Sequence, residues 1–473
     1  MKRNLFGTAL IALIAISGMF FLSGCAKKIS KPSIIVSKPG IAGVVYPSSW
    51  HMYALNQGHA ATFNKPGEKA AAVSWKFGVQ DAIPFNMPVS EIKKKYVSIT
   101  NVRDLIGIPI GVAVVKGVVF APDDNGYLYA INAANGKLIW KANVLNQIMS
   151  TPIVANTPRG ELVYVGGGNS VFAYSHAVKF GIPGAQVIRG VDISGIYALN
   201  AKNGHLVWAY HTKGEDMPTG VYYKNKFIFG NGDGHIYALN ASTGKLLWKV
   251  FIKSFVSMSS ATRYNNLIIM GGTHPNYLYA VNANTGKLAW KVMPPKVFSS
   301  SMGDGSPAVS VRNGIVVIQI EQKAPSVHRS SSVEIGLNAK NGKILWSTNL
   351  GEGSVPPRNK DAVPMIYKGV IYTGSPVTAA AYALDVKTGK ILWKTPLHVK
   401  MKAAPSIQGQ DIFFPVGNGK IFAVNKADGK IIHVYVSGNG GFGPQNAVIV
   451  DHTMFIGSNF GWVYAIPTSK ITG

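Results

Sequence analysis

Apolar and polar residues alternate in short runs along this chain of 473 residues, and most runs are followed by a tight turn and a second run that ends in tryptophan. Residues 234–249 show the pattern, with Ile236 and Ala238 in the first run, Gly244 in the turn and Trp248 in the second run. A period of two predicts β-strands, and a glycine between two such runs predicts a hairpin turn. The same pattern recurs at residues 127–141, 195–209, 276–291, 333–347, 380–394 and 420–434, the last with His433 in place of tryptophan. A unit repeated at a regular interval predicts one structural module per copy.

We interpret each copy as strands C and D of a β-propeller blade, preceded by a pair of strands A and B such as residues 306–318. The chain ends at residues 444–466 with strands A, B and C but no strand D. Residues 72–77, around Trp75, have the D pattern without a C strand directly before them, so the two ends are predicted to complete one blade and to leave no open sheet edge. The sequence therefore predicts an all-β fold: an eight-bladed β-propeller of four-stranded antiparallel blades, one domain over residues 46–473.

The spacing of the repeats shows where extra residues are inserted. Trp208 and Trp248 are 40 residues apart, which is the length of a bare blade, whereas other intervals are longer. The additions fall between strands B and C or between strand D and the next strand A, and these two connections emerge on the same face of a four-stranded meander. Loops on a rigid scaffold commonly carry function. We therefore expect function on that face, which carries the insertions 77–107, 174–194, 292–305, 321–332 and 348–362.

The N-terminus has the form of an export signal, because a basic start precedes a long apolar run within residues 1–24. The sequence Leu22-Ser23-Gly24-Cys25 resembles a bacterial lipobox. This resemblance implies cleavage before Cys25, lipidation of that residue and a tether over residues 25–45. It also implies a cell-envelope location, as an outer-membrane lipoprotein that faces the periplasm or the exterior and contacts the membrane through its lipid. An uncleaved membrane anchor is the alternative, although the apolar run is short for a span.

The chain is strongly basic, with 47 Lys and Arg against 20 Asp and Glu and a net charge of +27. Such a balance is compatible with nucleic acid, anionic lipid, an anionic substrate or acidic surroundings. Nucleic acid is not expected as the partner of an exported protein, which leaves anionic lipid, an anionic small-molecule substrate and acidic surroundings. Few carboxylates also suit a protein that works in acid, because fewer groups change charge on folding at low pH.

Three of the scarce acidic residues lie just before a predicted strand A, where the chain reaches the rim of the channel: Asp216, Asp304 and Asp361. The alternative is that each caps a turn or accepts backbone N–H groups. Asp304 is the strongest candidate for catalysis, because glycines on both sides allow a ligand to approach closely and because two insertions belong to its own blade.

Cationic and histidine side chains on loops of the same face are candidates to hold an anion, although each is equally compatible with a solvated loop charge. No serine triad, phosphate loop or close histidine pair is visible, and the single cysteine, Cys25, excludes disulfides and cysteine-ligated metals from the folded domain, so no metal site is expected. The candidate anion-binding residues are Lys296, Arg358, His328 and Arg329, with Lys360, Lys402, His211 and His274 as further members.

The units Tyr237 to Trp248 and Tyr382 to Trp393 resemble the repeats of the pyrroloquinoline-quinone-type (PQQ-type) propeller family, and residues 50–59 look like the N-terminal segment of that family. The resemblance covers roughly residues 46–470 and implies the fold. Dehydrogenases of the family usually carry a vicinal cysteine pair over the quinone, and this chain has no such pair. Bound quinone and any other cofactor are therefore not expected, and a quinone-dependent dehydrogenase is the weakest of the alternatives.

Two branches of that family remain. One is the propeller lipoprotein of the β-barrel assembly complex of the outer membrane, a scaffold without enzymatic activity, which the lipobox and the blade count resemble. The other is the tetrathionate hydrolases of acidophilic sulfur oxidisers, exported propellers with long insertions and an essential aspartate that acts as an acid. By blade and loop, Asp304 in residues 303–307 is the position similar to that aspartate. The resemblance implies acid-assisted cleavage of an S–S bond to thiosulfate, sulfate and sulfur. Long loops are also compatible with a homodimer.

Overall fold

The computed structural model describes residues 47–63, 72–80, 82–83, 108, 110–124, 126–144, 147–168, 194–298, 301–325, 328–356, 361–438, 440–443 and 446–473. The predicted signal peptide 1–24 and the tether 25–45 with Cys25 lie outside these residues, as do Arg358 and most of the insertions 77–107 and 174–194. Within the described ranges, no helix combines the length and the apolar character needed to cross a membrane.

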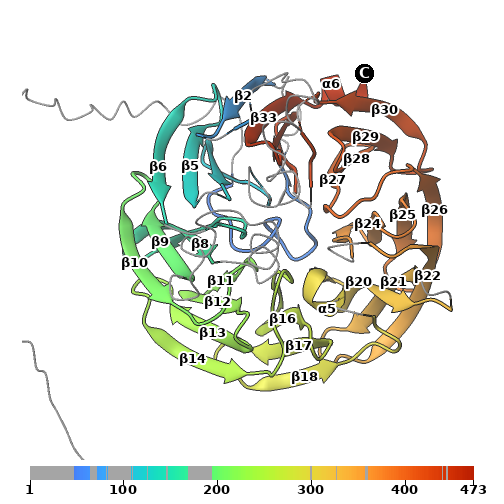
Figure 1. Ribbon diagram of the computed structural model, residues 1–473, viewed down its shortest axis with the longest axis horizontal. Coiled ribbons are helices and arrows are strands. Elements are labelled where there is room, and N and C mark those ends of the chain that lie inside the picture. The colour runs from blue at the N-terminus through green and yellow to red at the C-terminus, as the bar shows by residue number, and fades with distance from the viewer. Residues whose placement is uncertain are drawn as a thin grey trace, which may run out of the picture. The chain divides into compact units, whose positions relative to one another are not determined.

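The described strands form eight sheets arranged in a ring, as the sequence predicts (Figure 1). Blade 1 contains β3 (Ala113–Val115), β4 (Val118–Pro122), β5 (Tyr127–Asn132) and β6 (Leu138–Asn143). Blade 2 contains β7 (Ile153–Thr157), β8 (Gly160–Gly167), β9 (Gly195–Asn200) and β10 (Leu206–His211). Blade 3 contains β11 (Val221–Tyr223), β12 (Lys226–Gly230), β13 (His235–Asn240) and β14 (Leu246–Phe251). Blade 4 contains β15 (Thr262–Tyr264), β16 (Leu267–Gly272), β17 (Tyr277–Asn282) and β18 (Leu288–Val292).

The second half of the ring follows the same order from the innermost strand A to the outermost strand D. Blade 5 contains β19 (Ala308–Ser310), β20 (Ile315–Lys323), β21 (Arg329–Asn338) and β22 (Ile344–Ser354). Blade 6 contains β23 (Met365–Tyr367), β24 (Val370–Thr373), β25 (Ala380–Asp385) and β26 (Ile391–Pro396). Blade 7 contains β27 (Ser406–Gln408), β28 (Asp411–Pro415), β29 (Lys420–Asn425) and β30 (Ile431–Val436). Blade 8 contains β31 (Val448–Val450), β32 (Thr453–Gly457), β33 (Trp462–Pro467) and β2 (Trp75–Gly78), and two short helices are α5 (Ser301–Asp304) and α6 (Ser469–Thr472).

The ring closes by pairing of its two ends, which confirms the predicted arrangement around Trp75. Strand β2 pairs antiparallel with β33, and Trp75 lies opposite Ala465. The N-terminal part of the chain therefore supplies strand D of the blade whose strands A, B and C come from the C-terminus. Since this pairing is antiparallel and continuous with the rest of the sheet, blade 8 has the same architecture as its neighbours.

Tryptophan residues on strand D connect each blade to the next, in agreement with the packing role that their repetition predicts. Trp208 is buried, and its indole N–H donates a hydrogen bond of 2.9 Å to the carbonyl of Ala241 in the next blade. The indole ring of Trp208 also covers Gly244. The φ of +74° at Gly244 and its close contact with the indole leave no room for a side chain. Equivalent hydrogen bonds to the following blade are donated by Trp75, Trp140, Trp248, Trp290, Trp346 and Trp393.

Among the described D strands, the tryptophan position of the repeat is occupied by another residue only in blade 7, by His433. The structure supplies the reason. The blade that follows it is blade 8, whose strand D comes from the N-terminus, so no C–D turn exists there to receive an indole. Helix α6 packs against β30 instead, and Gly473 lies beside the imidazole of His433. The change in the repeat therefore marks the point where the ring closes.

An N-terminal segment, residues 50–63, lies inside the ring against the innermost strands (Figure 1). Trp50 exchanges two backbone hydrogen bonds with Val154 of blade 2, at 2.7 and 2.8 Å. Further along, backbone hydrogen bonds link the segment to blades 3, 5 and 6, and strand β1 (Thr62–Phe63) pairs parallel with β31 of blade 8. The sequence predicts a channel lined by strand A, whereas in the structure this segment covers the inner side of several A strands.

Blade 5 differs from the others in the length of its strands. Strands β20, β21 and β22 have 9, 10 and 11 residues, whereas most B, C and D strands of the other blades have five or six. Much of the predicted insertions 321–332 and 348–362 is therefore strand rather than loop. The insertion 292–305 contains α5, which is separated from β19 by residues 305–307.

Candidate functional site

One backbone position is equivalent in blades 2 to 7, and its residues define what we call the collar. It lies four residues before the first residue of strand A, on the connection that enters the blade from strand D of the previous one. Because the blades are arranged around one axis (Figure 1), equivalent positions on these connections are brought to the same level of the ring. In chain order the collar consists of Met149, Met217, Met258, Asp304, Asp361 and Lys402.

The first half of the collar is apolar. Met149 and Met217 are buried and pack in one cluster with Ile110 of blade 1, and the partly buried Met258 packs against them. These side chains come from four consecutive blades, so they meet only because the connections converge on the inside of the ring. The cluster forms a wall of flexible, polarisable side chains.

The second half of the collar is charged, and the structure brings Asp304 and Asp361 together. Asp361 is buried, and its Oδ2 accepts a 2.7 Å hydrogen bond from the hydroxyl of Ser301, the first residue of α5. Ser301 Oγ in turn accepts a hydrogen bond of 2.8 Å from the backbone N–H of Glu321 on β20. Since Asp304 ends the same short helix, this pair of hydrogen bonds holds it next to Asp361.

Burial raises the pKa of Asp361 well above its ordinary value, and the nearby carboxylates of Asp304, Glu321 and Glu334 raise it further. Its Oδ1 has no hydrogen-bond partner among the described residues. Burial therefore favours the neutral form of this carboxyl group over the charged one.

Two further carboxyl groups lie inside the strands of blade 5, and the sequence analysis missed both. Glu321 and Glu334 are fully buried. Burial raises the pKa of Glu334 to about 8, although a 3.2 Å hydrogen bond from the amide of Gln319 to its Oε2 opposes the shift. The oxygen of the same amide accepts the backbone N–H of Ala362 at 2.9 Å, which fixes the connection that carries Asp361. The sequence feature that could have identified them is an acidic residue within a mainly apolar strand, in a chain with few acidic residues.

Asp216 lies one residue earlier than the collar position and belongs to a different arrangement. Its Oδ1 accepts a 2.8 Å hydrogen bond from the amide of Asn231, and its Oδ2 is hydrogen-bonded to the hydroxyl of Thr212. Burial raises its pKa to about 8 despite these contacts. The collar residue of the same connection is Met217, so the structure separates Asp216 from the position shared by Asp304 and Asp361.

The predicted anion-binding residues of blade 5 lie at the surface, whereas Glu321, Glu334 and Asp361 are buried. Lys296, His328 and Arg329 have exposed side chains, and Arg329 Nε lies 3.9 Å from Glu352 Oε2 in an exposed ion pair. Arg329 is five residues from Glu334 along β21, which corresponds to about 17 Å of extended chain. Among the described collar positions the cation is Lys402 of blade 7.

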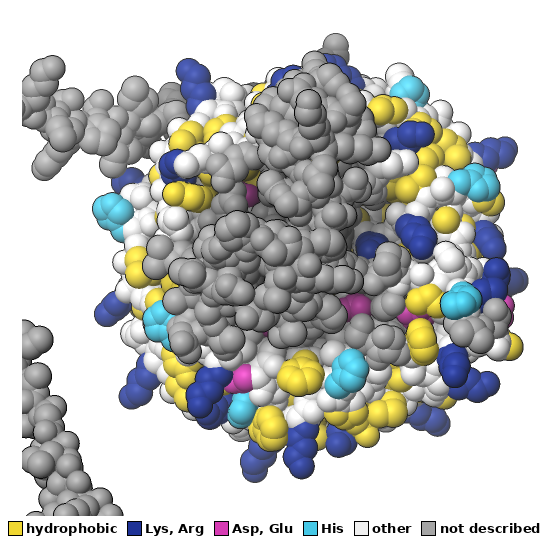
Figure 2. Space-filling view, in the orientation of Figure 1, with side chains coloured by type: hydrophobic (Ala, Val, Ile, Leu, Met, Phe, Trp, Pro, Cys, Tyr) yellow, Lys and Arg dark blue, Asp and Glu magenta, His cyan; other side chains and the backbone are white. Residues whose placement is uncertain are grey.

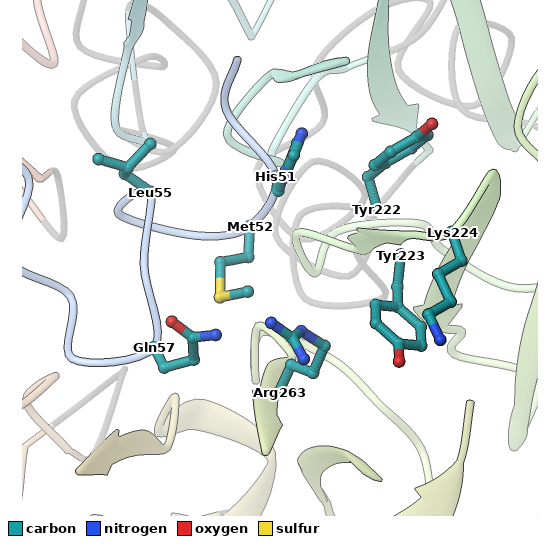
Figure 3. A pocket seen from close by; sticks show the side chains of 8 residues that line it. All are labelled: His51, Met52, Leu55, Gln57, Tyr222, Tyr223, Lys224 and Arg263. Carbon is teal, nitrogen blue, oxygen red and sulfur yellow. The ribbon is translucent and has the colours of Figure 1, made fainter. Parts of the chain in front are cut away.

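A cavity of about 270 Å³ lies elsewhere, beside the A–B turn of blade 3 (Figure 3). The guanidinium of Arg263 lies 4.9 Å from the ring centre of Tyr223, and burial together with Arg263 lowers the pKa of His51. A–B turns emerge on the face opposite the connections that carry the collar, so this cavity is separate from Asp304. Its lining residues are His51, Met52, Leu55, Gln57, Tyr222, Tyr223, Lys224 and Arg263.

Basic side chains are spread around the face shown in Figure 2 rather than gathered in one patch. Groups of three or more His, Cys, Asp or Glu side chains placed to bind a metal ion do not occur among the described residues. Among the described residues, the site therefore offers carboxyl groups, one lysine and a cluster of apolar side chains.

Comparison with known proteins gives full-length matches to enzymes. A tetrathionate hydrolase of Acidithiobacillus ferrooxidans is 34% identical over 486 residues, covering 99% of this chain and 95% of that protein. A tetrathionate hydrolase of Acidianus ambivalens is 32% identical over 465 residues, covering 90% of this chain and 85% of that protein.

Matches to the outer membrane protein assembly factor BamB are of two kinds. The sequence model of that family matches residues 72–266, 234–376 and 329–469. The BamB of Yersinia pestis is 26% identical over only 148 residues, 29% of this chain and 35% of that protein. The crystal structure of BamB from Moraxella catarrhalis shares the fold, with a TM-score of 0.54 and 16% identity over 76% of this chain and 94% of that one.

Proposed function

The chain belongs to the PQQ-type propeller family, in the group that contains the tetrathionate hydrolases, and on this basis we propose that it cleaves an S–S bond of tetrathionate with Asp304 as the acid. The observation that carries the proposal is the match to two such hydrolases over at least 90% of the chain. The BamB family model matches repeats across residues 72–469, but the BamB protein itself matches over only 29% of the chain. A non-enzymatic scaffold is therefore the weaker candidate.

The reaction has a definite balance. Tetrathionate and one water molecule yield thiosulfate, sulfate, one sulfur atom and two protons, so oxygen, sulfur and charge are conserved. The departing sulfur carries negative charge as the S–S bond breaks, and a positioned acid that donates a proton to it lowers the barrier. Water supplies the oxygen that appears in the new sulfate.

The collar offers the groups that this reaction needs. Asp304, at the end of α5, is held beside the buried Asp361 by the Ser301 hydroxyl. At an external pH below about 4 an ordinary aspartic acid is protonated and able to donate. Lys402, at the same collar position in blade 7, is the candidate cation for a sulfonate end of the dianion. The burial that raises the pKa of Asp361 also disfavours a second negative charge near an anionic substrate.

Export is part of the proposal, because residues 1–24 have the form of a signal peptide and residues 22–25 resemble a lipobox. Lipidation at Cys25 would hold the enzyme in the cell envelope, at the outer membrane, where it meets acidic external fluid. The mechanism needs no bound quinone and no metal ion. The insertion loops are a candidate surface for a homodimer.

The deciding experiment measures thiosulfate release from tetrathionate at pH 2 to 4 by the purified protein. Replacing Asp304 by Asn should abolish turnover while the circular dichroism spectrum is unchanged. The matched control is Asp216→Asn, which alters another carboxyl group close by in the sequence and should retain turnover. Normal activity of Asp304→Asn would refute the assigned role. Absence of activity in the wild type, together with co-purification of an outer-membrane barrel protein, would instead establish the scaffold function.

A further inference from the structure

The two halves of the collar differ in chemistry in the same way as the two parts of a polythionate do. A polythionate ion has a charged sulfonate at each end and a chain of uncharged divalent sulfur atoms between them. We infer that the apolar half of the collar, which consists of Met149, Met217 and Met258 together with Ile110, is the binding site for these divalent sulfur atoms. The inference rests on the proposed function and assigns residues that determine which polythionate is preferred.

The connections that carry the collar are also linked to one another two residues after it, where hydroxyl groups accept backbone N–H groups. Thr219 Oγ1 accepts the backbone N–H of Thr151 at 2.9 Å, and Ser260 Oγ accepts that of Thr219 at 3.1 Å. Ser306 Oγ continues the series into blade 5 by accepting the N–H of Ser260 at 3.0 Å. These links use no collar side chain, so a methionine of the collar can be replaced without removing them.

The position of the apolar wall within the ring supports a binding role. The methionines occur in blades 2, 3 and 4, and the charged residues occupy the same position in blades 5, 6 and 7. The two halves therefore follow one another around the ring (Figure 1) and meet between blades 4 and 5, where the backbone N–H of Met258 donates a 2.8 Å hydrogen bond to the carbonyl of Gly303. Below them, Tyr53 of the N-terminal segment donates a 2.7 Å hydrogen bond to Asn446, and Tyr53 and Ala54 pack against Val363 and Ala404. An ion that enters from the collar side therefore meets an apolar wall and an acidic wall above this floor.

The chemistry of the side chains matches that of the central sulfur atoms. Divalent sulfur is large, polarisable and weakly hydrated, and the thioether of methionine has the same properties. Methionine is also unbranched and flexible, so three of them adapt to a sulfur chain that has no fixed shape. The sulfonate ends instead need a cation such as Lys402, and the breaking S–S bond needs the proton of Asp304. Each part of the substrate thus meets the half of the collar that suits it.

A consequence for specificity follows. Trithionate, tetrathionate and pentathionate carry the same charge and differ only in the number of divalent sulfur atoms. Their charged ends make equivalent demands on Lys402, so discrimination among them falls to the apolar wall. Changing this wall should alter the preference for chain length, whereas changing a residue that only supports the fold should reduce the activity on all three ions alike.

The test compares the kinetics of Met217→Gln and the wild type on tetrathionate and pentathionate. Glutamine has nearly the length of methionine but a polar end, so KM for tetrathionate should rise about tenfold, the loss expected for one or two sulfur contacts. The effect on pentathionate should be larger, and kcat should change little because the proton donor is untouched. Met217→Leu, which restores an apolar side chain, should recover most of the affinity. Met293→Gln makes the same change at a methionine with 45% of its surface exposed, outside the collar, and should have no effect.

Each outcome decides a separate question. If the wild type hydrolyses no polythionate, the proposed function fails whatever the variants do. If the wild type is active but Met217→Gln leaves both KM values and their ratio unchanged, the inference is overturned and the proposed function stands. Should Met217→Gln fail to fold, Met258→Gln replaces it, because Met258 is only partly buried. The same increase in KM and the same shift in chain-length preference are expected there, and their absence is equally decisive.

Discussion

The stability of this protein should fall as the pH rises from about 4 to about 8, and Asp216 is the residue through which this is best tested. Burial raises the pKa of Asp216 from 3.8 to about 8. Between these two values the unfolded chain has released the proton and the folded chain keeps it. Stability is therefore fully present below pH 4 and is lost as the pH rises towards 8.

The hydrogen bonds of Asp216 agree with a protonated carboxyl group. The hydroxyl of Thr212 is within hydrogen-bond distance of both the Gly214 carbonyl and Asp216 Oδ2, and it has one hydrogen to donate. If that hydrogen goes to Gly214, a proton on Oδ2 completes the contact with Thr212. Asp216 Oδ1 accepts from Asn231 at 2.8 Å. Asparagine at position 216 can reproduce both contacts without carrying charge.

The magnitude follows from the shift in pKa. Each group that keeps a proton on folding contributes a slope of about −1.4 kcal/mol per pH unit to the free energy of unfolding. Over the three units from pH 4 to pH 7 this amounts to about 4 kcal/mol for Asp216 alone. Relative to the wild type, Asp216→Asn should therefore gain stability steadily as the pH rises. The gain should be absent at pH 4 and close to its maximum at pH 8.

Urea unfolding followed by tryptophan fluorescence at pH 4, 5, 6, 7 and 8 measures this difference. A histidine provides a control of opposite sign, because burial lowers the pKa of His59 to about 4. For His59 the unfolded chain binds the extra proton, so its contribution is present above pH 6.5 and is lost as the pH falls towards 4. His59→Gln should change the slope in that lower range and in the opposite direction. Parallel stability curves for Asp216→Asn and the wild type would refute the reasoning, as would a variant that is less stable at pH 7.

Two further predictions concern the site and the ring. In Gly271→Ala, the added Cβ would lie 1.8 Å from the carbonyl oxygen of Met302, so α5 must shift and carry Asp304 with it. For a displacement near 1 Å, kcat should fall about a hundredfold. Gly417→Ala, with no atom within 4 Å of the new Cβ, should behave as the wild type, and equal activity of both variants would contradict the assignment of α5. Trp208→Ala removes a buried indole and its hydrogen bond to the next blade, so urea unfolding should show a loss of about 3–5 kcal/mol; a loss below about 1 kcal/mol would contradict the role of this residue in joining the blades.

The architecture could be predicted because its causes are local and repeated. Alternation with a period of two, a turn glycine and a terminal tryptophan occur within about 16 residues, and seven copies average out the irregularities of any one. The closure at Trp75 also follows from counting strands at both ends of the chain. The reason for His433 was not visible in the same way, because it depends on which blade lies beside it in the ring.

The site could be predicted only in part. Asp304 and Asp361 were identified because both lie just before a predicted strand A, and a strand start can be estimated from the pattern. Asp216 was included by the same argument, but it lies one position away, and that difference places its carboxyl group against Thr212 and Asn231. An estimate of a strand boundary from sequence is too coarse to exclude an error of one residue.

Other parts of the site depend on contacts between distant segments. The N-terminal segment pairs with the inner strands through backbone hydrogen bonds, which have no signature in the side chains. Glu321 and Glu334 lie in strands that the sequence analysis treated as insertion or core. Lys296, His328 and Arg329 were grouped with Asp304 by their position in the chain, and the structure shows their side chains exposed while Glu321, Glu334 and Asp361 are buried.

The sequence by itself determined the ring of blades, the way it closes, and the scarcity of acidic residues that makes Asp304 conspicuous. The tertiary structure alone decided that burial raises the pKa of Asp361, that Ser301 joins it to the helix of Asp304 across 60 residues of chain, and that three methionines of successive blades form one cluster. Alternation and turns are properties of neighbouring residues. Burial, proton affinity and the composition of the collar depend instead on residues from several blades, which only the closed ring brings together.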